Sequence, residues 1–595
     1  MLAMGARQLA DAKAVVRNLS DVETLGATSQ INTDKTGTLT LNEMTVRALF
    51  NGGEWYAVDG EGYAVSGTVR GVAGAPETDF LPLAYVSALA SDATVSSHGD
   101  VVGDPTEAAV VVLAEKLGVS VDETRAAYPR LATVPFDSDY KFMATFHRLP
   151  YGGAPRLVGL VKGAPDVVMQ RCTHALVGGD LVPMETVAHR LVEANERLGE
   201  HGLRVLAMAV RLVDPEEEQM AVAEPMEAVH DLALLGLVGI VDPLRPEAVE
   251  SVRVAHEAGI EVRMITGDHL VTAEAIAKEL DLGPGGITGR DYAALSDEQA
   301  AERLDELHVF GRVAPEDKLR LVRLLQQRGN VVAMTGDAVN DAAALKQADI
   351  GVAMGSGSEV SKQAAKMVLT NDDFSTLVHA IELGREIFAR ITAYIGYQMV
   401  QLFALIGMFL LATALNVNSG VALLPLQVLF LNFTLAVVPV VIIALDRPEP
   451  GLMNQPPRNP SVRVFNRTTA LRWVGLGALL AALSLAPVAF GPDAPATDVA
   501  TVSVTMGFVV MGLSTALAGF VMRKSLAAAV TAPLVLPAAL TAGAGVLVVL
   551  ATEWAPLQRL LLTSDLTGSQ WLVCLGLSLT FALAVEAEKA WRRRR

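Results

Sequence analysis

Three short polar clusters, each containing an aspartate, have residue types that suit phosphoryl chemistry. The first, "QINTDKTGTLT", surrounds Asp34 with a lysine, a glycine and several threonines. The second, "MITGD", ends at Asp268, and the third, "MTGD", ends at Asp337. Carboxylate oxygens are ligands that Mg²⁺ prefers, and a carboxylate can also attack a phosphoryl group as a nucleophile. The alternative for each cluster is a turn or capping role, which Thr, Gly and Asp commonly have.

The segments before these clusters predict the elements that position them. "GIEVRMITGD" and "GNVVAMTGD" have the composition of β-strands, and helix-compatible stretches follow them at residues 270–280 and 340–348. "TSQINT", which precedes Asp34, is a weaker strand by itself. Strands that alternate with helices favour a parallel α/β sheet, in which ligands collect at the carboxyl ends of the strands. We therefore expect the three clusters to meet in one crevice.

Two carboxylates in one crevice repel each other unless a proton or a cation lies between them. Asp34 and Asp337 could share Mg²⁺, and Lys318, in "GRVAPEDKLRLV", is a candidate clamp for phosphoryl oxygens. The chain contains no G-x-x-x-x-G-K-[ST] loop. The sequence therefore excludes ATP handling of the P-loop kind.

The composition separates a soluble part from a membrane part. The chain has 595 residues, of which 51% are hydrophobic, and a formal net charge of −18. Charged and apolar residues are mixed up to about Asn371, whereas the sequence from Tyr394 onward is mostly apolar. The negative charge argues against a nucleic-acid partner. Cys172 and Cys574 offer no disulfide framework or thiolate metal site, and the first residues lack the sustained apolar core of a signal peptide.

Six apolar stretches reach the roughly 20 residues that a helix needs to cross a bilayer. They lie near residues 394–415, 421–445, 470–490, 499–522, 526–551 and 570–587. A large buried helical core is the alternative, but soluble helices of this length usually carry a polar face. Cations such as Arg447, Arg467 and Arg592 gather on one side, whereas the loops "NVNSG" and "GPDAPATD" carry none. This asymmetry predicts a multi-pass protein of the cell membrane whose soluble part and C-terminus are cytoplasmic.

The order of the motifs resembles that of the P-type ATPases. "DKTGTLT" at 34–40 is similar to the family's phosphorylation signature, and it is followed, in the family's order, by "KGAPD" at 162–166, "DPLRPE" at 242–247, "MITGD" at 264–268, "GRVAPEDK" at 311–318 and "TGDAVND" at 335–341. The resemblance covers essentially the whole chain and is closest to the cation-transporting, calcium-pump-like branch. The cysteine-bearing ion motif of the heavy-metal branch is not seen.

The resemblance implies a fold and a set of domains. The fold would be an α/β haloacid-dehalogenase-like, Rossmann-type phosphorylation domain with an inserted α+β nucleotide-binding domain, followed by an all-α six-helix transmembrane domain. Residues 1–48 would form the stalk and the first segment of the phosphorylation domain, and residues 241–372 its second segment. Residues 49–240 are too many for a loop and predict the inserted domain. Residues 373–595 would form the transmembrane domain.

For the phosphorylation domain, the resemblance implies that Mg²⁺ and ATP are used. Asp34 would be phosphorylated, Asp337 would be the second Mg²⁺ ligand, and Thr36 would offer the metal its backbone carbonyl. Lys35 would shape the loop around Asp34. Further contacts to the phosphates and the metal would come from Thr266, Gly267, Asp268, Arg312, Lys318, Asn340 and Asp341. Two alanines, Ala338 and Ala343, stand where the family usually has a glycine and a proline, so we expect the loop after Asp337 to differ slightly.

For the inserted domain, the resemblance implies a pocket for the adenine nucleotide. Glu107 would lie near the base and Phe136 would stack on it. The remaining contacts would come from Lys141, from Lys162 and Gly163 at the pocket floor, and from Arg204 toward the phosphates. Ordinary core packing is the alternative for Phe136, and simple solvation is the alternative for Lys141.

The spans offer few ligands for a transported cation. Leu402, Leu405 and Ala436 stand where the family has ion ligands, and the first two spans have no interior carboxylate. Tyr394, Gln398 and Gln401 share one helical face. A polar path could be lined by Gln398, Gln401, Asn432 and Thr434. Hydrogen bonding between helices is an equal alternative for these residues.

The family's first four spans and its actuator domain are absent from this sequence, so the chain resembles the C-terminal portion of a pump. Three functions stay open: an ATP-driven cation pump or its catalytic part, a membrane-anchored ATPase or phosphatase without transport, and an inert pump remnant. We expect that the chain alone does not pump, because alternating access in this family needs the actuator domain.

Overall fold

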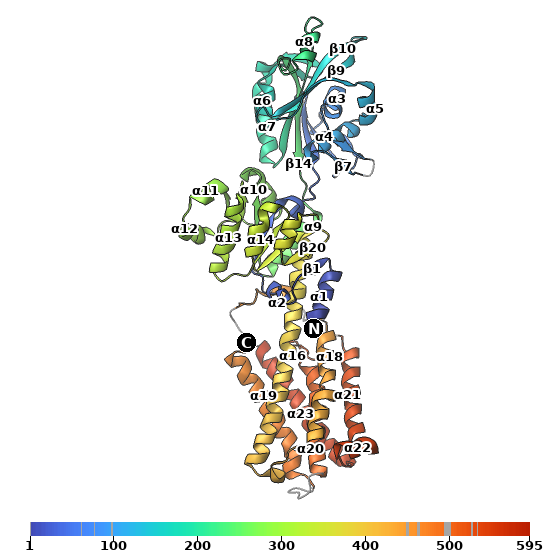
Figure 1. The fold of residues 1–595 in the computed structure, drawn as a ribbon, viewed down its shortest axis with the longest axis vertical. Helices are drawn as coiled ribbons and strands as arrows, with labels where there is room; N and C mark the ends of the chain where they lie inside the picture. The colour runs from blue at the N-terminus through green and yellow to red at the C-terminus, as the bar shows by residue number, and fades with distance from the viewer. Residues whose placement is uncertain are drawn as a thin grey trace. The chain divides into compact units, whose positions relative to one another are not determined.

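The computed structural model describes residues 2–60, 62–76, 78–96, 99–447, 451–460, 464–492, 501–524, 527–531 and 533–594. It divides into two compact units. The first, here called the head, comprises Gln30–His256 and Glu261–Ser375, and the second, the membrane unit, comprises Met1–Ser29, Glu257–Ile260 and Thr376–Arg595. Figure 1 labels many of the elements of both.

The first sheet of the head is parallel, as the sequence predicts. Its strand order is β20-β19-β18-β2-β15-β17-β16. The strands are β2 (Gln30–Asp34), β15 (Glu261–Thr266), β16 (Gly286–Thr288), β17 (Val309–Gly311), β18 (Val332–Gly336), β19 (Ile350–Met354) and β20 (Met367–Leu369). The helices between them are α9 (Pro246–Glu257), α10 (Leu270–Glu279), α11 (Gly289–Ala294), α12 (Asp297–Arg303), α13 (Pro315–Gln327), α14 (Ala342–Gln347) and α15 (Glu359–Ala364). The weak run before Asp34 is thus a central strand, because pairing on both sides supplies what its own composition lacks.

The second sheet of the head is largely antiparallel, in the order β5-β4-β3-β14-β13-β10-β9-β8 with β11 and β12 beside it. The strands are β3 (Thr45–Asn51), β4 (Glu54–Val58), β5 (Val69–Gly71), β8 (Arg130–Val134), β9 (Phe142–Tyr151), β10 (Ala154–Gly163), β11 (Cys172–Val177), β12 (Asp180–Pro183), β13 (Arg204–Leu212) and β14 (Leu232–Val241). A separate hairpin pairs β6 (Thr94–Val95) with β7 (Val101–Val102).

Helices flank this second sheet: α3 (Leu81–Leu89), α4 (Pro105–Lys116), α5 (Val121–Ala127), α6 (Pro165–Met169), α7 (Met184–Glu200) and α8 (Glu218–Ala223). Two hydrophobic clusters surround its buried strands, one containing Leu160 and Val238 and the other containing Phe142 and Leu237. The first strand and the last strand of this segment pair with each other, with Thr45 opposite Val241. The expected division of the head at residues 48 and 240 stays a prediction, and both positions fall inside these two strands.

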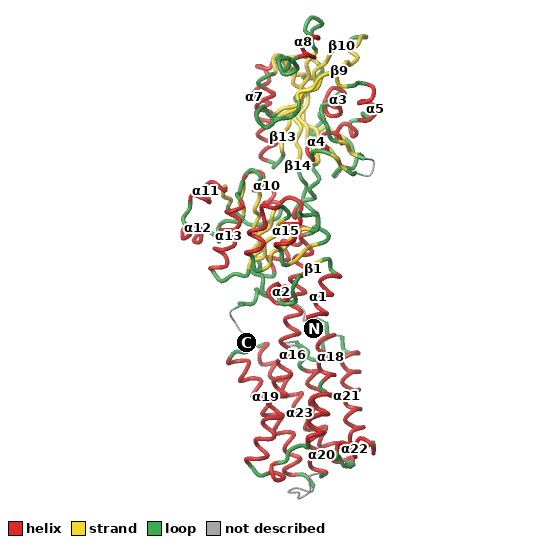
Figure 2. The backbone as a smooth tube through the Cα atoms, viewed as in Figure 1, coloured by secondary structure: helices red, strands yellow, loops and turns green. Residues whose placement is uncertain are grey.

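Within its described residues, the membrane unit contains six helices that are long and apolar enough to cross a membrane. They are α16 (Phe374–Ala414), α17 to α18 (Pro425–Leu445), α19 (Arg467–Phe490), α20 (Val502–Val521), α21 (Val535–Glu553) and α23 (Gly568–Arg593). The shorter elements are α1 (Leu2–Asp11), β1 (Ala14–Val16), α2 (Asp21–Leu25) and α22 (Ala555–Leu561). Figure 2 shows the six long elements as helices throughout.

The six helices agree with the six predicted spans in number and order. The first begins 20 residues earlier than the apolar stretch near 394, because α16 is a continuous helix of 41 residues. The second contains a π-helical segment at Phe430–Leu435, where Ala436 N–H bonds to the carbonyl of Leu431. The predicted starts of the fourth and fifth spans, at residues 499 and 526, lie outside the described residues, as does most of the loop at 491–498.

Candidate active site

The backbone at Asp34 is fixed at the carboxyl end of the central strand β2. Asp34 lies beside Ile265 of β15, and the pairing of Asn32 with Met334 brings the end of β18 to the same edge of the sheet. The Asp34 N–H donates to Thr335 Oγ1 at 3.1 Å, and that hydroxyl in turn donates to Thr33 Oγ1 at 3.0 Å. The convergence of these strand ends was predicted; the hydroxyl of Thr335 was not.

Lys318 joins two carboxylates at this edge. Its ammonium lies 2.6 Å from Asp34 Oδ2 and 2.8 Å from Asp341 Oδ1, and Lys318 is only 4% exposed. Pro315 begins helix α13 and places Lys318 in the first turn, where it faces the sheet together with the buried Leu321. The second Asp341 oxygen accepts from the N–H of Ala338 at 3.2 Å. One cation therefore links β2 to the loop after β18.

Burial and mutual repulsion shift the acids of this site in one direction. Burial raises the pKa of Asp34, and the Lys318 charge opposes this shift. Burial, followed by the negative charges of Asp34 and Asp341, raises the pKa of Asp337. Burial by itself lowers the pKa of Lys318. The charges of Asp34 and Asp341, which the ammonium contacts, outweigh burial, so the pKa of Lys318 is raised. The site thus holds more negative charge than its own cation neutralises.

This excess charge fits a divalent cation. A Cβ on Gly37, whose φ is +71°, would lie 3.7 Å from Asp337 Oδ2, so the Asp337 carboxylate lies against the loop that follows Asp34. The two carboxylates and the carbonyl of Thr36 are hard oxygen donors of the kind that Mg²⁺ prefers. Within the described residues, no group of three or more His, Cys, Asp and Glu side chains is placed to hold a metal. A magnesium ion here would rely on two carboxylates and on backbone or phosphate oxygens.

Lys35 fastens the same loop to two further acids. Its ammonium forms an ion pair with Asp268 and lies 4.0 Å from Asp242 Oδ2. Thr40 Oγ1 donates to Asp242 Oδ2 at 2.6 Å, and burial raises the pKa of Asp242. Asp242 was not predicted as a site residue, although its motif "DPLRPE" was noted. The sequence signal for Asp242 was its position directly after the predicted inserted domain, which ends at residue 240.

Other predicted residues have local roles in the structure. Thr266 Oγ1 accepts from the N–H of Asp268 at 3.1 Å, which shapes the turn after β15. Arg312 has a left-handed φ of 51°, its N–H donates to the carbonyl of Asp268, and its side chain is exposed. Asn340 is also exposed. Ala338 has φ −100° and ψ 164°, so the residue in the glycine position uses extended backbone that alanine adopts without strain.

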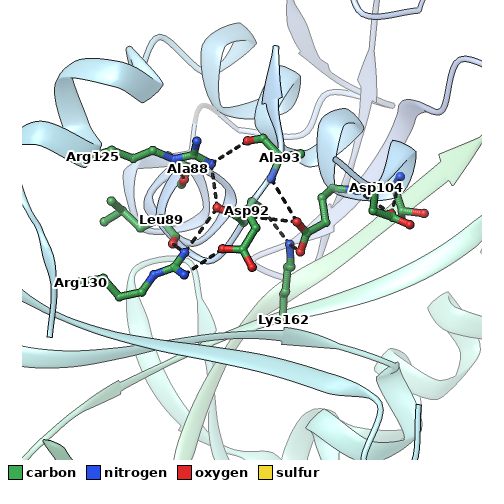
Figure 3. A network of polar contacts seen from close by, with 11 residues as sticks. Ala88, Leu89, Asp92, Ala93, Asp104, Arg125, Arg130 and Lys162 are labelled. Atoms are coloured by element: carbon green, nitrogen blue, oxygen red, sulfur yellow. Dashed lines mark hydrogen bonds and ion pairs between the residues drawn. The ribbon is translucent and has the colours of Figure 1, made fainter. Parts of the chain in front are cut away.

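A second polar cluster forms around Lys162, at the end of β10. The Lys162 ammonium donates to Glu107 Oε1 at 2.7 Å and to Ser91 Oγ at 2.8 Å. The other Glu107 oxygen accepts from the N–H groups of Asp92 and Ala93, at 2.8 and 3.2 Å. Figure 3 shows Lys162 beside the segment that carries these two residues. Burial lowers the pKa of Lys162, and the charge of Glu107 opposes this shift.

Two arginines that the sequence did not single out brace this cluster (Figure 3). Arg125 donates to the carbonyls of Ala88 and Ser91 at 2.9 and 2.8 Å, and Arg130 donates to Asp92 Oδ1 at 2.8 Å. Both cap the carboxyl end of helix α3. No motif marks them, because a capping arginine can come from any nearby element.

The remaining residues of the predicted nucleotide pocket are open to solvent or packed against backbone. Phe136 is 62% exposed, which rules out the core alternative. Lys141 adopts a left-handed φ of 55°, and its carbonyl accepts from Ala164 N–H at 2.9 Å. A Cβ on Gly163 would lie 2.6 Å from that carbonyl oxygen, so only glycine fits there. Arg204 donates to Thr106 Oγ1 at 3.1 Å.

The predicted cation path is not assembled as the sequence suggested. Gln398 donates to Tyr394 Oη at 3.5 Å, and Asn432 donates to the carbonyl of Val428 in its own helix at 2.9 Å. Asn432 and Thr434 are exposed on the outer face of their helix, as is Leu402 on α16, whereas Gln401 and Leu405 are buried. Of the four path residues, the structure turns only Gln401 into the helix bundle.

Three family models match parts of this chain. The model described as P-type ATPase, cytoplasmic domain N, matches residues 80–247. The haloacid dehalogenase-like hydrolase model matches residues 319–381, and the model described as cation transporting ATPase, C-terminus, matches residues 420–591.

Curated relatives align over most of this chain but over only part of their own length. Cation-transporting ATPase pma1 of Synechocystis sp. is 39% identical over 479 residues, which cover 77% of this chain and 52% of the relative. Calcium-transporting ATPase lmo0841 of Listeria monocytogenes is 36% identical over 488 residues, with coverages of 81% and 53%. Probable cation-transporting ATPase F of Mycobacterium tuberculosis is 40% identical over 500 residues, with coverages of 81% and 54%. The chain spans about half the length of the curated relatives it matches.

Proposed function

Because this chain belongs to the P-type cation ATPases of the calcium-pump-like branch, we propose that its head transfers the γ-phosphoryl group of ATP to Asp34 and that this step serves cation transport across the cell membrane. The observation that carries the proposal is the position of the Lys318 ammonium, which contacts Asp34 and Asp341 together.

In the proposed reaction an oxygen of Asp34 attacks the γ-phosphorus. The new bond is an acyl phosphate, the bond to the bridging oxygen breaks, and ADP leaves with the electron pair. Lys318, whose ammonium contacts the Asp34 carboxylate, is placed to stabilise charge on the transferred oxygens. The Thr335 hydroxyl, by accepting from the Asp34 N–H, holds the nucleophile in its orientation.

Asp34, Asp337 and the carbonyl of Thr36 would hold Mg²⁺, which when bound neutralises the phosphates and the excess carboxylate charge. Lys35 keeps the loop in position through Asp268 and Asp242. Asp341 keeps Lys318 charged and accepts a hydrogen bond from the N–H of Ala338, so it supports the site through the lysine and through the loop.

For ATP binding, we assign the exposed ring of Phe136 to stacking on the adenine. Lys162, Glu107 and Arg204 supply polar contacts near it, together with the exposed Lys141. The Lys162–Glu107 pair is buried before the nucleotide arrives, and an uncharged nitrogen of the base can share its hydrogen bonds without a new charge being buried.

For the orientation, the distribution of Arg and Lys over the loops supports a cytoplasmic head and a cytoplasmic C-terminus. ATP is then on the side of the head. An ATPase without transport stays the second candidate, because the chain spans about half of its relatives' length.

The test is phosphoenzyme formation by the purified chain in detergent with γ-labelled ATP and Mg²⁺. We expect label that survives acid and is released by hydroxylamine, as for an acyl phosphate. Asp34→Asn should remove it. Asp305→Asn, at an exposed acid paired with Arg328 in the same domain, is the matched control and should keep it. Label that persists in Asp34→Asn would identify another nucleophile. Labelling that no added cation alters would favour the second candidate.

A further inference from the structure

Several polar side chains in the described part of the membrane unit are buried without a hydrogen-bond partner, and four almost fully buried ones among them lie on helices α16 and α20. They are the hydroxyls of Tyr397, Ser514 and Thr515 and both amide atoms of Gln401. The residues are at most 5% exposed. Inside a bilayer, water does not reach such groups, so an unsatisfied donor or acceptor there is strongly unfavourable. A fold that keeps four of them needs a reason.

Other buried hydroxyls of the same unit do have hydrogen-bond partners. Thr505 and Ser578 donate to the carbonyl four residues earlier, at 3.0 and 2.9 Å, and Thr552 does so at 3.3 Å. This bond is available to any serine or threonine in a helix. Ser514 and Thr515 lie in the middle of α20 and do not form it, so their hydroxyls stay available.

Helix register brings the four residues to one level of the bundle. Close contacts at Gly396 with Trp473 and at Gly407 with Ala481 show that α16 and α19 run parallel. Contacts at Gly491 with Ser503 and at Gly507 with Val488 show that α19 and α20 run antiparallel. Helices α16 and α20 are therefore antiparallel to each other.

A direct contact then fixes the alignment of α16 with α20. A Cβ on Gly507 would lie 3.5 Å from Met408 Cε. Gln401 precedes Met408 by seven residues, and Ser514 follows Gly507 by seven. Seven residues are nearly two turns, about 10.5 Å, and return to the same face. Because the helices are antiparallel, seven residues back along α16 and seven residues forward along α20 move in the same direction along the bundle. Gln401 and Ser514 therefore come opposite each other. Tyr397 lies one turn from Gln401, and Thr515 is next to Ser514.

The chemistry of this cluster selects its ligand. It offers hydroxyl and amide oxygens and no charge. The stretches 394–445, 468–490, 501–521, 535–552 and 568–585 contain no Asp or Glu. A dehydrated divalent cation would need carboxylates to neutralise it, whereas a monovalent cation can be held by neutral oxygens.

We propose that Tyr397, Gln401, Ser514 and Thr515 form an intramembrane site for an alkali cation, Na⁺ or K⁺. The inference rests on the proposed function of cation transport, and it names the class of ion.

The experiment is equilibrium binding of ²²Na⁺ and, in place of K⁺, ⁸⁶Rb⁺ to the full chain in detergent, without ATP or Mg²⁺. We expect saturable binding of at least one of the two. Gln401→Leu, and Ser514→Ala combined with Thr515→Val, should each weaken it at least tenfold. Ser578→Ala, which removes a buried hydroxyl bonded within its own helix, should leave it unchanged. Excess Ca²⁺ should not displace the bound ion.

Equal binding by wild type and Gln401→Leu would overturn the site, as would Ca²⁺ displacing the label at equal concentration, or the absence of alkali binding by the folded wild type. That last result is expected if the cluster instead holds water along a proton path. Asp34→Asn should still bind the ion. Phosphoenzyme without ion binding therefore rejects this site alone, and ion binding without phosphoenzyme rejects the proposed function alone.

Discussion

The polar cluster of the head and the polar cluster of the membrane unit differ in charge and in hydrogen bonding. Around Asp34 the groups are charged, and both lysines touch carboxylates: Lys318 touches Asp34 and Asp341, and Lys35 touches Asp268. Around Gln401 the groups are neutral and have no partner. In the head, opposite charge holds the side chains in place. In the bundle, apolar packing holds them, and their polarity is left for a ligand.

The difference predicts opposite signs for the effect of removing one group. Breaking a buried ion pair leaves an uncompensated charge and destabilises strongly. Removing a buried polar group that has no partner relieves a penalty that the fold already bears. The four predictions below test this contrast, from the largest expected effect to the smallest.

Lys318→Met should give the largest effect, because it leaves Asp34 and Asp341 facing each other without a cation. We expect the head to lose about 3–5 kcal/mol of unfolding free energy and all phosphoenzyme. The loss should shrink at low pH, where Asp34, whose pKa burial raises, becomes protonated. Denaturant unfolding of the head between pH 5 and pH 8 measures this.

Lys278→Met is the matched control for that experiment, because Lys278 is an exposed lysine of the same domain. Its stability and labelling should be those of the wild type. A Lys318→Met protein as stable as this control would contradict the view that charge pairing holds the head's site together.

Gln401→Leu should change the stability in the opposite direction. In buffer without alkali cations we expect it to stabilise the membrane unit by about 1–3 kcal/mol, because the unsatisfied amide is removed. Gln427→Leu is the matched control: Gln427 is fully buried, accepts from Leu424 N–H at 3.1 Å and donates to the carbonyl of Leu561 at 3.2 Å. Its loss should destabilise by a similar amount.

The measurement for this pair is thermal unfolding in detergent, with choline as the only monovalent cation. If both substitutions destabilise, Gln401 has partners after all and the contrast between the two clusters fails.

The pH dependence of Mg²⁺ binding should report the raised pKa of Asp337. Above that pKa the carboxylate is charged and binds the metal; as the pH falls through it, protons compete and affinity drops. The drop should begin above the pH expected for an ordinary aspartate, whose pKa is about 3.9. In the unfolded chain Asp337 stays charged to lower pH, so without metal its charge destabilises the fold most at high pH.

Calorimetric titration of the chain with Mg²⁺ from pH 7 down to pH 4.5 gives the profile, and proton release on binding gives an independent check. Asp337→Asn should remove the part of the pH dependence that Asp337 contributes and leave the part that comes from Asp34. An affinity that stays flat until the pH approaches 4 would show that burial and the charges of Asp34 and Asp341 do not raise the pKa of Asp337.

Phe136→Ala should give the smallest effect, confined to binding. The exposed ring contributes little to folding, so stability should change by less than about 0.5 kcal/mol. Loss of stacking on adenine should weaken ATP binding by about 0.5–1.5 kcal/mol, roughly two- to thirteenfold. Tyr151→Ala removes another exposed aromatic ring from the same sheet and should leave ATP affinity unchanged. Equal effects of the two substitutions would remove Phe136 from the nucleotide site.

The sequence predicted the head's site better than the bundle's, for a physical reason. In a parallel sheet the strand ends share one edge, so motifs that end strands must converge, as Asp34 and Asp337 do. In a membrane helix the lipid-facing and core-facing sides are equally apolar, so hydropathy does not fix the rotation of the helix. Gln398, Asn432 and Thr434 were assigned to the interior for lack of that information.

In the head, the sequence did not predict contacts between side chains that come from separate segments of the chain. The Thr335 hydroxyl under Asp34, the Asp242 carboxylate beside Lys35, and the arginines that cap α3 come from separate segments. Their positions follow from strand register and helix packing, which pattern alone does not specify. The exposure of Phe136, which decides between core and binding site, likewise required coordinates.

The pairing of β3 with β14 has a consequence for how such a protein can be built and rebuilt. Since Thr45 stands opposite Val241, the segment between them leaves and rejoins the rest of the head at neighbouring points. A segment with adjacent ends can be removed, replaced or permuted with little change in chain entropy, because a short linker closes the gap. The segment that forms the second sheet can therefore be gained or exchanged as one unit. A gene could acquire it in a single insertion, and a designed protein could carry a different domain there while the parallel sheet that contains Asp34 stays unchanged.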